Sequence, residues 1–77
     1  MEQKINQDLF IGKNIKDARV AAGLSQEQLS AKLQTLGCDI SRGTLAKIEV
    51  GIRHLKTSEI KVIKEILKID YEFIFKD

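Results

Sequence analysis

Arg42, Thr44 and Lys47 place three hydrogen-bond donors near the start of one short expected helix. Arginine and lysine can donate to O6 and N7 of guanine, and threonine can contact a thymine methyl group or a phosphate. Gly43 and Ala46 lie on the same outer face and are small enough to let a helix approach a groove closely. These residue types at this spacing predict a helix that enters the major groove of double-stranded DNA.

Two sequence signals for helix starts predict the helices that would hold residues 42–47 in position. Ser25 can cap a helix whose third residue, Gln28, reaches back to form a capping box. Ser41 can cap the next helix, and Gly51 is placed to end it in a left-handed conformation. Two short helices that meet at a compact corner are what the major groove admits. We therefore expect a helix-turn-helix unit at about residues 25–51.

Apolar residues recur at helical spacing along the rest of the chain, which contains no proline. Thr57 or Ser58 is expected to cap a fourth helix, and Asp70 a fifth. The expected helices cover about residues 7–22, 25–36, 42–50, 57–68 and 71–75. The sequence thus predicts an all-α fold in which residues 1–77 form a single domain.

The composition of the 77-residue chain is that of a globular domain, with 43% hydrophobic and 31% charged residues. The net charge of +2 is weak evidence for a nucleic-acid partner when taken alone. There is no signal-peptide pattern and no apolar run of the ~20 residues that a membrane span needs. We expect a cytoplasmic protein with no membrane partner.

Enzyme chemistry finds no support in the sequence. Paired carboxylates in a shared cleft and a nucleophile–base pair are absent, and Gly12-Lys13 lacks the flanking residues of a P-loop. His54 has no neighbours at metal-ligand spacing, and Cys38, the one cysteine, cannot form an internal disulfide. We expect a protein that is not an enzyme, holds no metal or cofactor, and carries Cys38 as an inert turn thiol.

A set of residues spread over most of the chain resembles the phage-repressor/Cro type of helix-turn-helix, often called the XRE family. The resemblance covers roughly residues 9–75, and as a set its matches are specific. It implies a compact five-helix, lambda-repressor-like DNA-binding domain that acts as a dimer on a palindromic operator. The matching residues are Ile11, Gly12, Ile15, Arg19, Gly23, Leu24, Ser25, Gln26, Leu29, Ser41, Leu45, Ile48, Glu49 and Gly51.

The resemblance also implies roles for individual residues. Gln26 would donate a hydrogen bond to a DNA phosphate. The alternative is that Gln26 is only a solvated polar residue at the start of a helix. Arg19 and Glu49 would form a partly buried salt bridge between the first and third helices, although such residues are most often surface charges. Arg53 and His54, followed by Lys56, would touch the phosphate backbone, unless they are simply solvated loop residues.

The connection between the second and third helices departs from the family pattern. Seven residues, Gln34 to Ile40, separate Leu33 from Ser41, where members usually have a shorter connection. We expect a longer second helix and a wider turn that still present the third helix.

The sequence as a whole predicts a sequence-specific, double-stranded DNA-binding transcriptional regulator that acts as a dimeric repressor. The alternative is an antitoxin or a protein-interaction adaptor that keeps the fold and holds a partner through its apolar C-terminal segment. Both the dimer and the alternative depend on apolar side chains that so small a domain is not expected to hide. These are Val62, Ile66, Ile69, Phe73 and Phe75.

Overall fold

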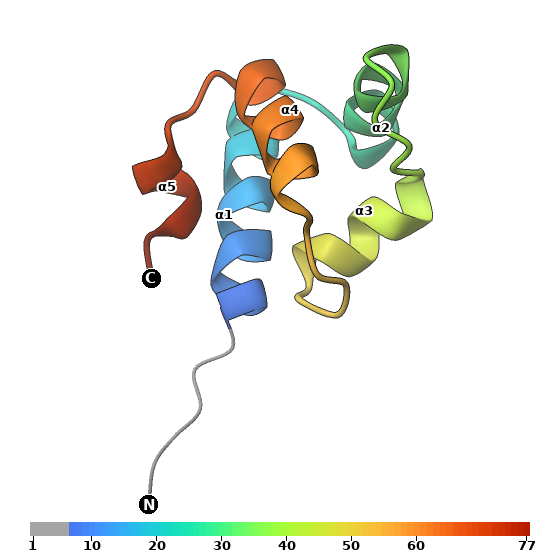
Figure 1. The fold of residues 1–77 in the computed structure, drawn as a ribbon. Coiled ribbons are helices and arrows are strands. Elements are labelled where there is room, and N and C mark those ends of the chain that lie inside the picture. The colour runs from blue at the N-terminus through green and yellow to red at the C-terminus, as the bar shows by residue number, and fades with distance from the viewer. Residues whose placement is uncertain (1–6) are drawn as a thin grey trace, which may run out of the picture.

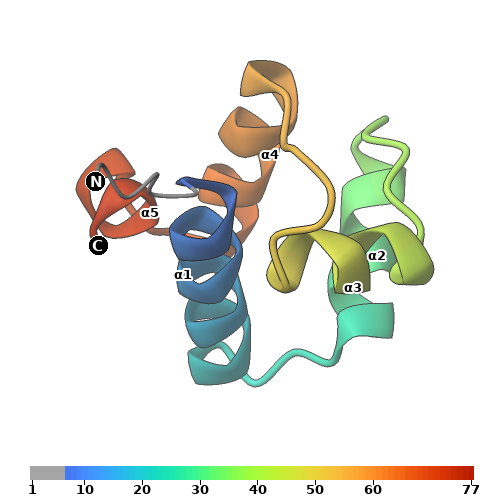
Figure 2. The ribbon, with the colours of Figure 1, turned by 90° about the horizontal axis from the view of Figure 1, so that it is seen from below.

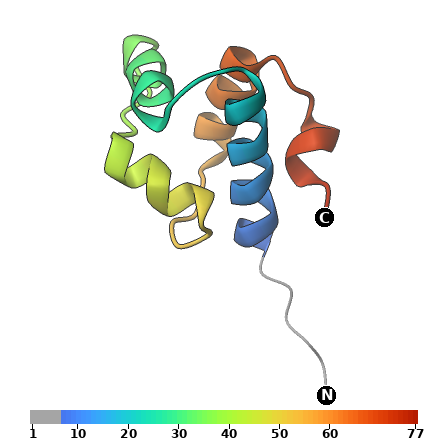
Figure 3. The same cartoon turned by 180° about the vertical axis from the view of Figure 1, so that it is seen from behind.

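The computed structural model describes residues 7–77, which form five helices and no strand (Figure 1). Helix α1 lies between α5 on one side and α3 on the other, while α2 contacts both α3 and α4 (Figures 1 and 3). Among the described residues no helix combines the length and the hydrophobicity of a bilayer crossing. The helices are α1 (Gln7–Ala21), α2 (Gln26–Thr35), α3 (Arg42–Glu49), α4 (Thr57–Leu67) and α5 (Tyr71–Phe75).

One hydrophobic core joins all five helices. Its fully buried side chains come from every helix and from the turn between α2 and α3, and each contributes about 1.5–3 kcal/mol through burial. Because α2 and α3 share this core with α1 and α4, the corner they form is fixed relative to the rest of the molecule. The largest fully buried side chains are Ile15, Leu29, Leu33, Ile40, Leu45, Ile48, Ile63 and Ile74.

Side-chain caps start three of the helices, and the expected capping residues are confirmed at each. At α2, the Ser25 hydroxyl accepts the Gln28 N–H at 3.0 Å, and the Gln28 carboxamide oxygen accepts the Ser25 N–H at 2.8 Å. The Ser41 hydroxyl accepts an N–H at the start of α3, and the Asp70 carboxylate does the same for α5. The predicted helix boundaries agree with the observed ones to within one or two residues.

The cap of α4 corrects the sequence-based expectation. Neither Thr57 nor Ser58 caps this helix, because its N-cap residue is Lys56. The Lys56 backbone N–H donates to a carboxylate oxygen of Glu59 at 2.8 Å, three residues further on. A glutamate that reaches back therefore replaces the expected hydroxyl cap, and helix α4 begins at Thr57 itself.

The connection between α2 and α3 consists of the end of α2 and a turn that includes buried residues. Helix α2 continues to Thr35, and Gly37 then turns the chain with a φ of 80°. Cys38 and Ile40 are buried, and the Ser30 hydroxyl donates to the Ile40 carbonyl at 2.7 Å. The additional residues therefore pack into the core and hold α3 in place.

The expected surplus of apolar surface is wrong for four of the five side chains. Only Phe75 is largely exposed, at 53%, whereas the other four are partly buried against the core. The chain after α4 folds back so that α5 packs against α1, where the buried Asn14 carboxamide donates to the Ile74 carbonyl at 2.9 Å. The four packed side chains are Val62, Ile66, Ile69 and Phe73.

Candidate nucleic-acid interface

Helix α3 turns one polar face to solvent. Arg42 and Lys47 are exposed on it, while Leu45 and Ile48 are buried on the opposite face. Within residues 7–77, neither Arg42 nor Lys47 makes a side-chain hydrogen bond or an ion pair. Their donors are therefore available to another molecule.

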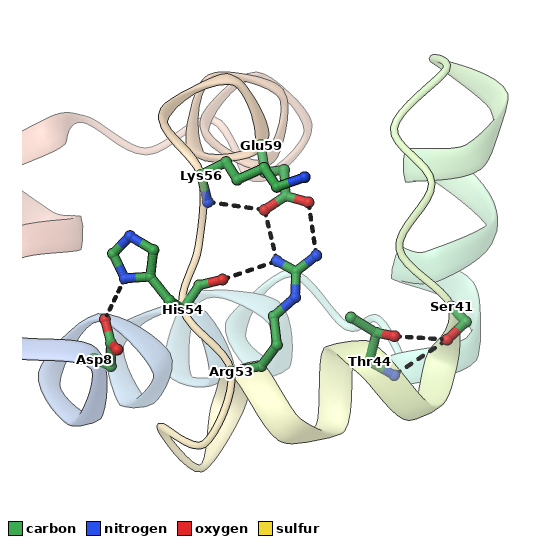
Figure 4. Close-up of polar contacts among 7 residues, drawn as sticks. All are labelled: Asp8, Ser41, Thr44, Arg53, His54, Lys56 and Glu59. Atoms are coloured by element: carbon green, nitrogen blue, oxygen red, sulfur yellow. Dashed lines mark hydrogen bonds and ion pairs between the residues drawn. The ribbon is translucent and has the colours of Figure 1, made fainter.

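The smaller residues on this face leave it open. Gly43 is exposed, a Cβ atom at this position would meet no heavy atom within 4 Å, and Ala46 is half-buried. Thr44 is half-buried beside the cap, where its hydroxyl oxygen accepts a hydrogen bond from the Ser41 hydroxyl at 3.0 Å (Figure 4). Since that oxygen accepts, the Thr44 hydroxyl proton stays available for an outside acceptor.

Arg19 and Glu49 join α1 to the end of α3. Arg19 donates from Nε to Glu49 Oε2 at 2.7 Å and from Nη2 to Oε1 at 3.0 Å. A third bond runs from Nη1 to the Leu24 carbonyl at 2.8 Å. The side chains are only 10% and 1% exposed, respectively. A buried, two-pronged ion pair thus sets the position of α3 relative to α1.

Gln26 is the first residue of α2, and its side chain is tied to the same carboxylate. Its Nε2 donates to Glu49 Oε1 at 3.0 Å, and the residue is half-buried. The structure therefore joins the residue predicted to contact a phosphate, Gln26, to the predicted salt bridge of Arg19 and Glu49. No local sequence signal links residues 23 positions apart in this way.

Arg53, in the loop after α3, is already engaged with Glu59 of α4 (Figure 4). Its guanidinium donates to both carboxylate oxygens, at 2.6 and 3.0 Å, and also to the His54 carbonyl at 2.9 Å. The hydrogen bond from Arg53 holds the pKa of Glu59 below its ordinary value, with help from the Lys56 N–H, and Glu59 raises the pKa of Arg53. Glu59 was not among the site residues predicted from the sequence, although a glutamate three residues after a helix start is a recognisable signal.

The lowered pKa of Glu59 predicts an acid-sensitive contribution to stability. Glu59 binds its proton less readily in the folded than in the unfolded chain, so its contribution is complete above the ordinary pKa of 4.5 and is lost as the pH falls through the lower, folded value. We expect Glu59→Gln to destabilise the protein at about pH 7 but much less at about pH 3, as measured by urea unfolding. An equal loss at both pH values would contradict this assignment.

His54 is 76% exposed, and its Nδ1 lies 3.0 Å from Asp8 Oδ1 in the first turn of α1 (Figure 4). Among the described residues no group of three or more His, Cys, Asp or Glu side chains is placed to hold a metal ion. Burial raises the pKa of the Cys38 thiol, and the nearby Glu59 carboxylate acts in the same direction. Cys38 is therefore a poor nucleophile at neutral pH.

Viewed from below, α2 and α3 cross on the side of the molecule away from α5, and the loop to α4 leaves from the end of α3 (Figure 2). Gln26 at the start of α2 is bonded to Glu49 at the end of α3, and Arg53 in the loop after α3 is paired with Glu59 of α4. The arrangement is a short, rigid helix with free donors, flanked by two further polar sites.

Comparison with known proteins identifies this arrangement. A family model described as "Helix-turn-helix" matches residues 15–74, which include α2, α3 and the turn between them. The chain belongs to the XRE-type helix-turn-helix family. XRE-type proteins are DNA-binding proteins and not enzymes, and the five-helix, strand-free fold of residues 7–77 is consistent with the family.

Two curated relatives of this XRE-type chain are each named an uncharacterized HTH-type transcriptional regulator. The protein of Rickettsia conorii is 34% identical over 74 residues, which are 96% of this chain and 54% of the relative. That of Rickettsia prowazekii is 32% identical over 74 residues, 96% of this chain and 52% of the relative. The chain thus spans about half the length of the curated relatives it matches. No solved structure matches it.

Proposed function

We propose that this XRE-type protein is a sequence-specific, double-stranded DNA-binding transcriptional regulator that represses its target as a dimer on a palindromic operator. The observation that carries the proposal is the outer face of α3. Arg42 and Lys47 are exposed there with no intramolecular partner among the described residues. Free, positively charged donors on a helix of this kind suit the guanine edges of the major groove.

The contacts that hold α3 in place favour recognition of bases over non-specific electrostatic attraction to DNA. Recognition of a base edge requires donors held in a defined geometry, and α3 is fixed by its core contacts, its Ser41 cap and the buried Arg19–Glu49 pair. Glu49 is also the one acidic residue within Arg42–Glu49, and Arg19 neutralises it. The exposed face of α3 therefore carries positive charge alone.

Contacts to the phosphate backbone are assigned to Gln26, Arg53 and His54. Glu59 and the His54 carbonyl use three of the five N–H groups of Arg53, so two remain for a phosphate. Because Glu59 compensates the charge of Arg53, a contact between Arg53 and a phosphate would help to orient the protein on DNA but would add little net electrostatic attraction. Of the three, His54 is the most exposed.

Alanine substitution on α3 tests the proposal. We expect Arg42→Ala or Lys47→Ala to cost about 1–3 kcal/mol of binding to an operator obtained by selection from random duplexes. Each should also reduce the discrimination between operator and unrelated DNA, because a base contact is lost. Fluorescence anisotropy on both duplexes measures these effects.

Lys61→Ala is the matched control, since Lys61 is an exposed residue of α4 and loses the same charge. It should leave the discrimination unchanged. If Arg42→Ala and Lys47→Ala weaken binding to operator and unrelated DNA equally, these residues do not read bases and the assignment of α3 is wrong.

The alternative function is an antitoxin or adaptor that binds a partner through its C-terminal apolar segment. It has little support, because this segment exposes little apolar surface. Four of the five side chains that suggested it pack against the core. What α5 still exposes is a stacked pair, Tyr71 and Phe75, with ring centroids 6.3 Å apart. A protein that acts only through this pair would bind no duplex selectively.

A further inference from the structure

The carboxylate of Glu49 is shared between two partners. Its Oε2 accepts from Arg19 Nε at 2.7 Å, and its Oε1 accepts from both Arg19 Nη2 and Gln26 Nε2, each at 3.0 Å. An ionised carboxylate can only accept hydrogen bonds. The carboxamide of Gln26 must therefore turn its nitrogen, and not its oxygen, toward Glu49.

This constraint leaves Gln26 with one defined free donor. A carboxamide nitrogen carries two hydrogens, and the bond to Glu49 uses one of them. Gln26 is also the first residue of α2, where unpaired backbone N–H groups favour a negatively charged ligand. The second hydrogen of Nε2 is thus held beside a helix end that is suited to a phosphate.

We propose that Glu49 is a positioning residue for the DNA phosphate contact of Gln26, and that it makes no DNA contact itself. Arg19 completes the arrangement, because its guanidinium neutralises a carboxylate that would otherwise repel the phosphate. The buried pair then has two functions: it joins α1 to α3, and it fixes the donor at the start of α2. This inference rests on the proposed function, since it assumes that Gln26 meets DNA.

A thermodynamic cycle on DNA affinity tests the proposal. The probe is a mixed-sequence duplex about 30 base pairs long at low salt, where phosphate contacts dominate binding. Glu49→Gln should weaken binding by about threefold to tenfold, the range of one hydrogen bond. In the Gln26→Ala background, the same change should weaken binding by a smaller factor, because the donor that Glu49 orients is gone and only the effect on the position of α3 remains.

Glu65→Gln is the matched control for charge, because Glu65 is an exposed residue of α4. It should strengthen binding slightly and equally in both backgrounds. An equal loss from Glu49→Gln with and without Gln26 would overturn the proposal, since Glu49 would then act through the position of α3 alone. Failure of the proposed function itself looks different, because the unmodified protein would not bind the duplex.

A second measurement needs no variant and so does not depend on the fold surviving a substitution. In the NMR spectrum of the free protein, one of the two Gln26 Nε2 protons should be shifted downfield and slow to exchange because of Glu49. Addition of the duplex should then change the chemical shift of the other Nε2 proton. Two equivalent, fast-exchanging protons in the free protein, or no response to the duplex, would overturn the proposal.

Discussion

Glu49→Ala is expected to lower the free energy of unfolding by about 3–5 kcal/mol, because it leaves the buried Arg19 guanidinium without its carboxylate. Arg19→Met should cost a similar amount, since the Glu49 side chain is only 1% exposed and would lose its cation. The double variant should cost less than the sum of the two, because neither charge then remains unpaired. Urea unfolding of the four proteins gives the coupling energy.

Lys13 and Asp17 provide the matched control for this cycle. They form an ion pair at 3.0 Å within α1, but their side chains are 70% and 49% exposed. Solvent screening should limit their coupling to well below 1 kcal/mol. A coupling energy for Arg19 and Glu49 as small as that of the control pair would contradict the structural role given to them.

Gly12→Ala is expected to lower the free energy of unfolding by about 3 kcal/mol or more, because it overpacks the contact between α1 and α3. A Cβ atom at Gly12 would overlap the backbone carbonyl oxygen of Ile48 and lie 3.0 Å from the carbonyl carbon and oxygen of Glu49. Backbone atoms cannot swing aside as a flexible side chain can, so α1 and the end of α3 would have to move apart. The loss should appear in urea unfolding, and in DNA binding through the displacement of α3.

Gly43→Ala is the control for this substitution. The added Cβ meets nothing within 4 Å, and alanine favours a helix over glycine by about 0.5–1 kcal/mol, so stability should rise. Because Gly43 lies on the exposed face of α3, the same methyl group should hinder a close approach to DNA. A Gly12→Ala protein as stable as the unmodified one would show that α1 and α3 are not in the close contact described.

Local sequence signals predicted the helices well because the interactions that start and end them span only a few residues. The capping box at Ser25 and the caps at Ser41 and Asp70 formed as expected, since each side chain bonds an N–H three residues further on. The left-handed Gly51 likewise lies just two residues beyond Glu49, the last residue of α3. Such contacts depend little on the rest of the fold, so the pattern alone suffices.

Contacts between distant residues were less accessible to sequence reasoning. Val62, Ile66, Ile69 and Phe73 were expected to leave apolar surface uncovered, because nothing local indicates which elements pack against them or that α5 folds back onto α1. That return is held by Asn14, whose partner Ile74 is 60 residues away. The Gln26–Glu49 bond was missed for the same reason, because the core must first bring together residues that are 23 positions apart.

The residues proposed to contact DNA were predicted in part from local signals and in part from the family resemblance. The sequence placed Arg42 and Lys47 on the outer face of a helix, where the structure also has them exposed. Their contact with bases depends on a partner that the fold of one chain does not contain, so it stays a prediction. Arg53 was predicted to contact a phosphate, with a solvated loop residue as the alternative, and the structure pairs its guanidinium with Glu59.

Selection of binding sites from a random duplex library tests the central claim most directly. The unmodified protein should enrich one palindromic sequence whose half-sites are about 10 base pairs, or one helical turn, apart from centre to centre. This result is expected because two α3 helices related by a two-fold axis would meet successive major grooves. Binding at low salt with no enriched sequence would contradict sequence-specific recognition, and an enriched site without two-fold symmetry would contradict the dimer.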